Sequence, residues 1–154
     1  IMARKKNKTE LMTEQYLQAF KKISIDDIVL DSCSVKTNRR KLANSVNIDV
    51  RHRASYLITN ETSAAVGSVY DLVVFKTKKR NFILKVSCSY TILLTSEEPI
   101  TYDFMDAFVE LDLEATTWPY FREFVQNMVQ RAGLPPLTLP LIGLRTYMPN
   151  CAHL

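Results

Sequence analysis

The amino-acid sequence predicts an α+β domain in which a four-stranded antiparallel sheet packs with a long helix from the C-terminal half and a shorter N-terminal helix. Between residues 27 and 94, strand-like segments alternate with turn-forming residues, and amphipathic helical patterns lie on either side of them. Short connections between consecutive strands favour an antiparallel meander, because parallel pairing needs a crossover of about a dozen residues or more.

The composition is that of one folded domain. The chain has 154 residues, of which 47% are hydrophobic and 23% charged. We therefore predict a single domain over residues 1–154, with a basic, flexible N-terminus at 1–8 and a short tail at 144–154. No apolar run approaches the roughly 20 residues that cross a bilayer, and no signal-peptide pattern is present, so a cytoplasmic protein is expected.

The shorter helix is predicted over residues 9–22. Thr9 can cap its start, and Met12, Tyr16 and Ala19 follow at helical spacing. Such a helix has one apolar face and needs a partner surface, which the predicted sheet supplies.

Strands are predicted at residues 27–35, 46–58, 66–76 and 82–94. The second strand alternates apolar and polar residues, which indicates one exposed face. The third has apolar residues at both parities, which indicates burial on both faces. The fourth has one unbroken apolar parity. Residues 101–113 fit either a short helix or a fifth strand.

The long helix is predicted to begin near Thr116 or Thr117, with Pro119 in its first turn, and to end at Gly133. Its apolar residues recur at helical spacing and include Phe121, Phe124, Val125, Met128, Val129 and Ala132. The prolines of residues 134–141 cannot continue a helix, so this segment should run extended along the protein.

Two motifs carry a family resemblance. Residues 118–123 (WPYFRE) and 134–139 (LPPLTL), at this separation, resemble the hallmark of SecB-type protein-export chaperones. They are nearer to the SecB-like branch, which includes toxin-antitoxin-associated chaperones, than to SecB of the export pathway. The resemblance favours a helix at 101–113. Over the first hundred residues the chain resembles these chaperones in its pattern of predicted elements more than in residue identity.

The resemblance implies an ATP-independent holdase that binds unfolded or nascent polypeptides, either for protein export or for an antitoxin-type client. It also implies a homotetramer, a dimer of dimers, with the 118–131 helices at the subunit interface. SecA is the export partner of such chaperones and docks on an acidic face. This chain has a net charge of +4 and a sequence pI near 9.0, which argue against the assumption that it also binds SecA.

Candidate site residues follow from these motifs. The client-binding groove is expected to include Trp118, Tyr120, Leu134, Leu137, Leu139, Leu141 and Ile142, because an extended proline-rich tail offers more apolar surface than one domain edge easily hides. The oligomer interface is expected to include Arg122, Val125, Met128 and Val129.

Catalysis and cofactor binding are not predicted. His52 and His153 are isolated, and the sequence contains no HExxH, GxSxG or phosphate-loop motif. Cys33, Cys88 and Cys151 are widely separated, which indicates neither a disulfide framework nor a zinc site. Hand-over to a partner, rather than nucleotide hydrolysis, would then release a client.

The alternative function is a basic nucleic-acid-binding module. Basic clusters lie at residues 4–8, 39–41 and 76–80. They fall in the terminus and in loops, and no aromatic residues are interleaved with them as stacking platforms. Solvated loops are therefore the favoured interpretation, and nucleic acid is not the expected main partner.

Overall fold

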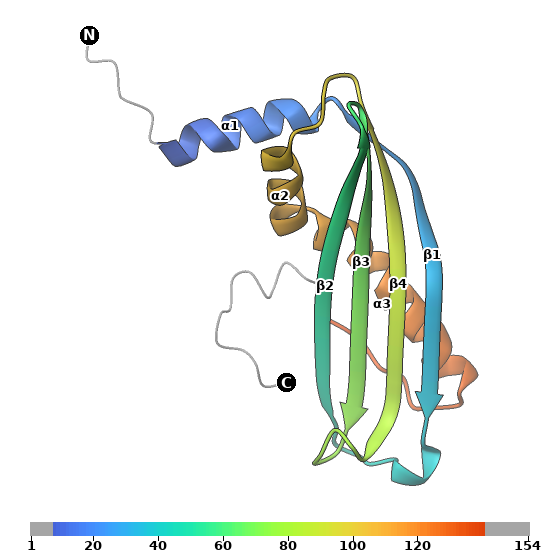
Figure 1. The fold of residues 1–154 in the computed structure, drawn as a ribbon. Helices are drawn as coiled ribbons and strands as arrows, with labels where there is room; N and C mark the ends of the chain where they lie inside the picture. The colour runs from blue at the N-terminus through green and yellow to red at the C-terminus, as the bar shows by residue number, and fades with distance from the viewer. Residues whose placement is uncertain (1–7, 141–154) are drawn as a thin grey trace.

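A computed structural model describes residues 8–140, with side chains from residue 12 onward. A four-stranded antiparallel sheet is covered on one face by helices α2 and α3, whereas α1 projects from one end of the sheet (Figure 1). We call the face under the helices the helix side and the opposite face the open side.

The elements in chain order are α1 (Lys8–Phe20), β1 (Ile23–Thr37), the 3-10 helix η1 (Arg39–Lys41), β2 (Asn47–Asn60), β3 (Ser63–Phe75), β4 (Phe82–Ser96), α2 (Tyr102–Leu111) and α3 (Leu113–Arg131). The predicted α+β class, the four antiparallel strands and both helices are confirmed. The partner surface of α1 differs from the prediction, because Tyr16 and Phe20 stack on Phe104 and Phe108 of α2 while α1 projects from the end of the sheet. The segment at 101–113 is helical, not a fifth strand, and the Thr101 hydroxyl caps α2 by accepting from the Phe104 amide.

The strand order is β1-β4-β3-β2, so the sheet is not the simple meander that we predicted. Hairpins join β2 to β3 and β3 to β4, but β1 pairs with β4 instead of β2. Residues 38–46, which include η1, are long enough to carry the chain past two strands at one end of the sheet (Figure 1). This connection gives a Greek-key arrangement.

The two faces of the sheet differ in burial. On the helix side, the apolar residues of β3 and β4 lie in the hydrophobic core, and Val66, Tyr70 and Ile92 are fully buried. On the open side the alternate residues of β3, such as Ala65 and Val69, are half-exposed. The prediction that the third strand is buried on both faces is therefore wrong, because none of the helices between residues 8 and 140 covers its second face.

Helix α3 begins at Leu113, earlier than predicted, and Pro119 lies inside it. The hydroxyls of Thr116 and Thr117 do not cap a helix start; they donate to the carbonyls of Asp112 and Leu113 at 2.8 and 2.9 Å. A proline inside a helix costs about 3 kcal/mol. Packing of the fully buried Leu113 and Thr117 offsets this cost. The predicted end at Gly133 is confirmed, with φ at 62°.

Candidate functional site

Trp118 ties the C-terminal segment to the core. Its indole Nε1 donates to the Pro140 carbonyl at 2.9 Å, and its ring packs against Tyr70 and Phe121 with centroid distances of 5.7 Å each. Trp118 is 3% exposed and Leu139 is 2% exposed. These two expected groove residues therefore lie in the chain's own core.

The other expected groove residues differ in access. Tyr120 is 46% exposed. Leu134 and Leu137 are half-buried and pack against the core. Leu141 and Ile142 lie outside the described residues. Of the described groove candidates, Tyr120 is therefore the one that presents an open apolar surface.

The residues expected at a subunit interface also divide by face. Val125 and Val129 point into the core and are 0% and 3% exposed. Arg122 and Met128 are half-exposed. Only Arg122 and Met128 could therefore contact another subunit without opening the core.

A buried polar cluster joins α3 to β2 and β3. Thr117 Oγ1 lies 2.8 Å from Tyr70 Oη and 3.1 Å from Ser68 Oγ, which in turn lies 2.8 Å from His52 Nε2. Burial lowers the pKa of His52, although the nearby Glu114 carboxylate opposes this shift. Ser68 is fully buried, so this Ser-His pair is closed to substrate and acts in packing. Sequence patterns gave no signal for this cluster.

One edge of the sheet, β1, has uncovered apolar residues on the helix side. Its β4 neighbours on that side are 3% exposed or less, whereas Ile25 and Leu30 of β1 are 43% and 40% exposed. The strand is interrupted by bulges at Asp26 and Asp31. Each of these carboxylates accepts a hydrogen bond from a threonine of β4. Bulges and charges of this kind restrict which strands can pair with an edge.

The opposite edge, β2, has a regular register with β3 from Asn47 to Ile58. Its apolar residues on the helix side are only half-covered, whereas their partners in β3 are 4% exposed or less. The half-covered residues are Ile48, Val50, Tyr56 and Ile58. Tyr56 Oη donates to Asp106 of α2 at 2.6 Å, and this bond raises the pKa of Tyr56 to about 12. Among residues 8–140 no strand pairs with the outer side of β2, so this edge offers backbone groups beside a row of accessible apolar side chains.

Two properties of the described residues bear on a metal site and on a membrane-spanning helix. Within residues 8–140 no group of three or more His, Cys, Asp or Glu side chains could hold a metal ion. None of the helices that the structure describes is long and apolar enough to cross a membrane.

The molecule combines a Greek-key sheet in this strand order, two helices on one face, and a C-terminal segment whose Pro140 carbonyl accepts a hydrogen bond from Trp118. This combination is a SecB-like fold. A solved structure shows the same fold: the SecB-like chaperone Rv1957 of Mycobacterium tuberculosis, in complex with a ChAD peptide from the antitoxin HigA1 (Rv1956). It aligns with a TM-score of 0.71 and 19% sequence identity over 85% of this chain and 98% of that chain. The fold that the two sequence motifs implied is thereby confirmed.

A second solved structure, of a protein of unknown function from Streptococcus agalactiae, aligns with a TM-score of 0.43 and 11% identity. The alignment covers 77% of this chain and 96% of that chain, but the likeness is too low to support an inference. No protein-family model and no curated protein sequence matches the chain.

Proposed function

We propose that this protein is an ATP-independent chaperone that binds unfolded or nascent polypeptides in the cytoplasm and keeps them from aggregating. The observation that carries the proposal is the edge of β2, where backbone groups that pair with no other described strand lie beside half-covered apolar side chains. The shared fold supports it, because Rv1957 is described as a chaperone in complex with an antitoxin peptide. This is a binding function that needs no catalytic residue.

An unfolded client presents both of the chemical groups that this edge can satisfy. Its backbone can pair with an edge strand, and its apolar side chains can lie over the apolar row of that strand. On the same helix side, Tyr120 and the half-buried Leu134 and Leu137 add apolar area. Main-chain pairing and apolar contact depend little on sequence, which suits a chaperone for varied unfolded segments.

An antitoxin-type client fits better than export through SecA. The chain has a net charge of +4, whereas SecA docks on an acidic face of the export chaperones that this sequence resembles. The peptide bound to Rv1957 comes from an antitoxin. We therefore place the client among unfolded segments of an antitoxin or another aggregation-prone protein.

Edge β1 has the properties of a subunit contact between two copies of the chain. Residues at equal distances from its middle are complementary: Asp27 matches Lys36, Ile28 matches Val35, and Leu30 matches Cys33. The bulge at Asp31 places Ile28, Leu30, Cys33 and Val35 on one face, since all pair with buried residues of β4. Two antiparallel β1 strands would therefore join apolar to apolar and Asp27 to Lys36.

A second contact would convert such a dimer into the tetramer that the resemblance implies. The accessible face of α3, with Arg122 and Met128, is available for it. Several copies of the client surface could then act on one flexible chain, which raises the overall affinity of individually weak contacts.

The test is an aggregation assay on a diluted, denatured client with the variant Ile48→Glu/Ile58→Glu. We expect protection to fall to near that of buffer, because the two carboxylates interrupt the apolar row of β2. The matched control is Ser55→Glu/Leu57→Glu, which also adds two carboxylates to β2 but on the open side, where Ser55 pairs with Gly67 and Leu57 with Ala65. Equal protection by both variants, with the fold intact by circular dichroism, would exclude β2 as the client surface.

A further inference from the structure

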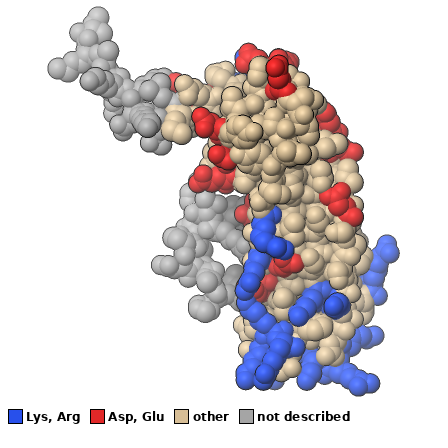
Figure 2. All heavy atoms as spheres, viewed as in Figure 1, with Lys and Arg blue, Asp and Glu red and all other residues tan. Residues whose placement is uncertain are grey.

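The charges of this protein are segregated along the sheet. Figure 2 shows Lys and Arg gathered at one end of the molecule, and Asp and Glu over the other half. The basic segments 39–41 and 76–80 are far apart in sequence, but the β1–β2 connection and the β3–β4 hairpin lie at the same end of the sheet (Figure 1). We call this region the basic end and define it by Lys36, Arg40, Lys41, Lys76, Lys78, Arg80 and Lys85.

The cations of the basic end form no ion pair with a carboxylate in the part of the chain that the structure describes. Lys36 and Lys85 lie directly opposite each other in the β1–β4 register, and like charges in that position destabilise a sheet. Lys85 Nζ lies 4.6 Å from the centre of the Phe82 ring. An external anion would relieve this repulsion.

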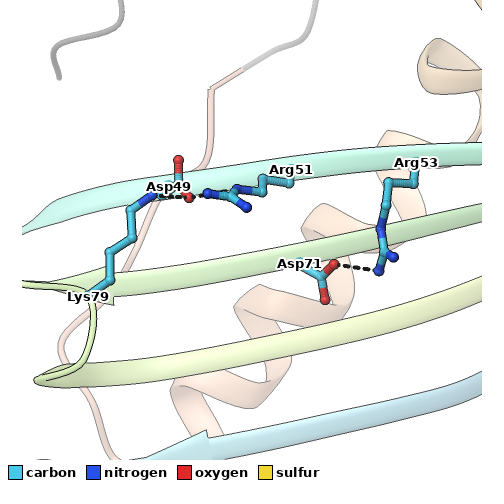
Figure 3. A network of polar contacts seen from close by, with 5 residues as sticks. All are labelled: Asp49, Arg51, Arg53, Asp71 and Lys79. Carbon is cyan, nitrogen blue, oxygen red and sulfur yellow. Dashed lines mark hydrogen bonds and ion pairs between the residues drawn. The ribbon is translucent and has the colours of Figure 1, made fainter.

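A hollow on the open side extends the basic end across β2 and β3. It has a volume of about 350 Å³ and is lined by Arg51, Lys79, Arg80 and Lys85 together with Asp49 and Asp71. Lys79 Nζ lies 2.7 Å from Asp49 and keeps the pKa of that carboxyl low, while Arg53 pairs with Asp71 at 2.9 Å (Figure 3). Cations outnumber carboxylates in the hollow, and Arg80 and Lys85 have no ion pair there.

We propose that the basic end binds the phosphate backbone of a nucleic acid, without reading its sequence. A polyphosphate carries about one charge per 1.7 Å in duplex form, so it can satisfy many scattered cations at once. An acidic peptide would need an acidic residue at each contact. The acidic half of the molecule, with Asp26, Asp27 and Glu97, would repel the same polyanion and so orient the protein. This binding goes beyond the proposed chaperone function and does not depend on it.

The experiment measures fluorescence anisotropy of a labelled duplex of about 20 base pairs, titrated with the full chain at rising salt. We expect a dissociation constant of about 10⁻⁶ to 10⁻⁴ M near physiological salt, with affinity that falls steeply as salt rises. The variant Lys78→Glu/Arg80→Glu should bind at least about tenfold more weakly, and its salt slope should fall by about one for each phosphate that it no longer binds. The matched control Lys21→Glu/Lys22→Glu makes the same change in net charge at the acidic half and should weaken binding far less.

Lys85→Glu separates binding from stability. It should weaken duplex binding and at the same time raise the unfolding temperature, because it replaces the like-charge pair with Lys36 by an opposite pair. A purely structural role for Lys85 would not move the two readouts in opposite directions. Loss of both binding and stability would count against the proposal.

Three further results would overturn the proposal that the basic end binds nucleic acid. The first is equal weakening by the basic-end variant and its control, which would reflect net charge alone. The second is loss of binding only when Arg4, Lys5, Lys6 and Lys8 are changed to Gln. The third is tighter binding of labelled polyglutamate than of the duplex, which would point to an acidic protein surface.

Discussion

Single buried polar residues fix the position of α3 on the sheet. Thr117 Oγ1 contacts both Tyr70 and Ser68 and also donates to the Leu113 carbonyl at 2.9 Å. His52 stacks on Tyr70 with ring centroids 4.5 Å apart and completes the cluster through Ser68. Because the hydroxyls of Ser68, Tyr70 and Thr117 all have partners, the cluster favours one placement of α3 over neighbouring ones.

The depressed pKa of His52 leads to a pH dependence of stability. Burial lowers its pKa in the folded protein below the value of about 6.5 that it has when unfolded. The unfolded chain therefore binds more protons, and the free energy of unfolding should fall as pH drops below about 6.5. We expect thermal unfolding of the native protein to show this decrease between pH 7 and 5, measured against His52→Gln.

His52→Gln keeps a hydrogen-bond donor beside Ser68 but cannot titrate, so its unfolding temperature should change less over the same pH range. The two curves should diverge on the acidic side. Parallel curves for the two proteins would show that His52 does not contribute to acid sensitivity.

At the scale of elements, sequence patterns predicted the features that depend only on residues close in sequence. The alternation of residues 46–58 and the apolar parity of 82–94 predicted strands, and Gly133 predicted a helix end, because each depends on neighbours in sequence. The start of α3 and the pairing of β1 with β4 depend on contacts between distant segments. Packing of Leu113 outweighed the helix-breaking tendency of Pro119, and no sequence pattern contains that information.

The candidate surfaces show the same limit. Apolar residues after Gly133 were predictable as a group, but which of them stay accessible depends on how the tail folds back. The Pro140 carbonyl accepts a hydrogen bond from Trp118 and the adjacent Leu139 lies in the core, whereas Tyr120 on α3 is exposed. The half-covered edge of β2 was also hidden from sequence, since alternation predicts a strand without saying that it ends the sheet.

The two faces of α3 predict opposite outcomes for neighbouring substitutions. Val129→Asp places a charge in the core and should cost about 3–5 kcal/mol of unfolding free energy, with a clear drop in unfolding temperature. Met128→Asp changes a half-exposed residue, so the fold should survive, while the proposed tetramer should separate into dimers. Thermal unfolding and native mass spectrometry distinguish the two effects.

The comparison is informative because the residues are adjacent and the introduced charge is identical. An unchanged tetramer in Met128→Asp would remove α3 from the subunit contacts. Unfolding of both variants would mean that Met128, too, is needed in the core.

At the scale of the whole molecule, the surfaces are separated by the geometry of the sheet. Helices cover one face, β1 and β2 form opposite edges, and opposite charges collect at the two ends (Figures 1 and 2). Register shifts interrupt β1, and such bulges restrict which strands can pair with an edge, whereas β2 keeps a regular register from Asn47 to Ile58. One edge is therefore suited to a second copy of the chain and the other to a client.

Self-pairing of β1 predicts a charge-swap result. Asp27→Lys or Lys36→Asp alone would place like charges opposite each other twice in each dimer and should weaken dimerisation by about 1–2 kcal/mol, which is roughly 5- to 30-fold in dissociation constant. The double variant restores opposite charges and should recover most of the affinity. Sedimentation equilibrium over a range of concentrations measures each constant. Comparison of the two single variants with the double variant also cancels the effect of removing the 2.9 Å hydrogen bond from the Ile28 amide to Asp27. Lys36→Asp also relieves the repulsion from Lys85 within the monomer, so the Lys36→Asp monomer should become more stable while its dimer weakens. If both single variants dimerise with the dissociation constant of the native protein, the pairing of two β1 strands is ruled out.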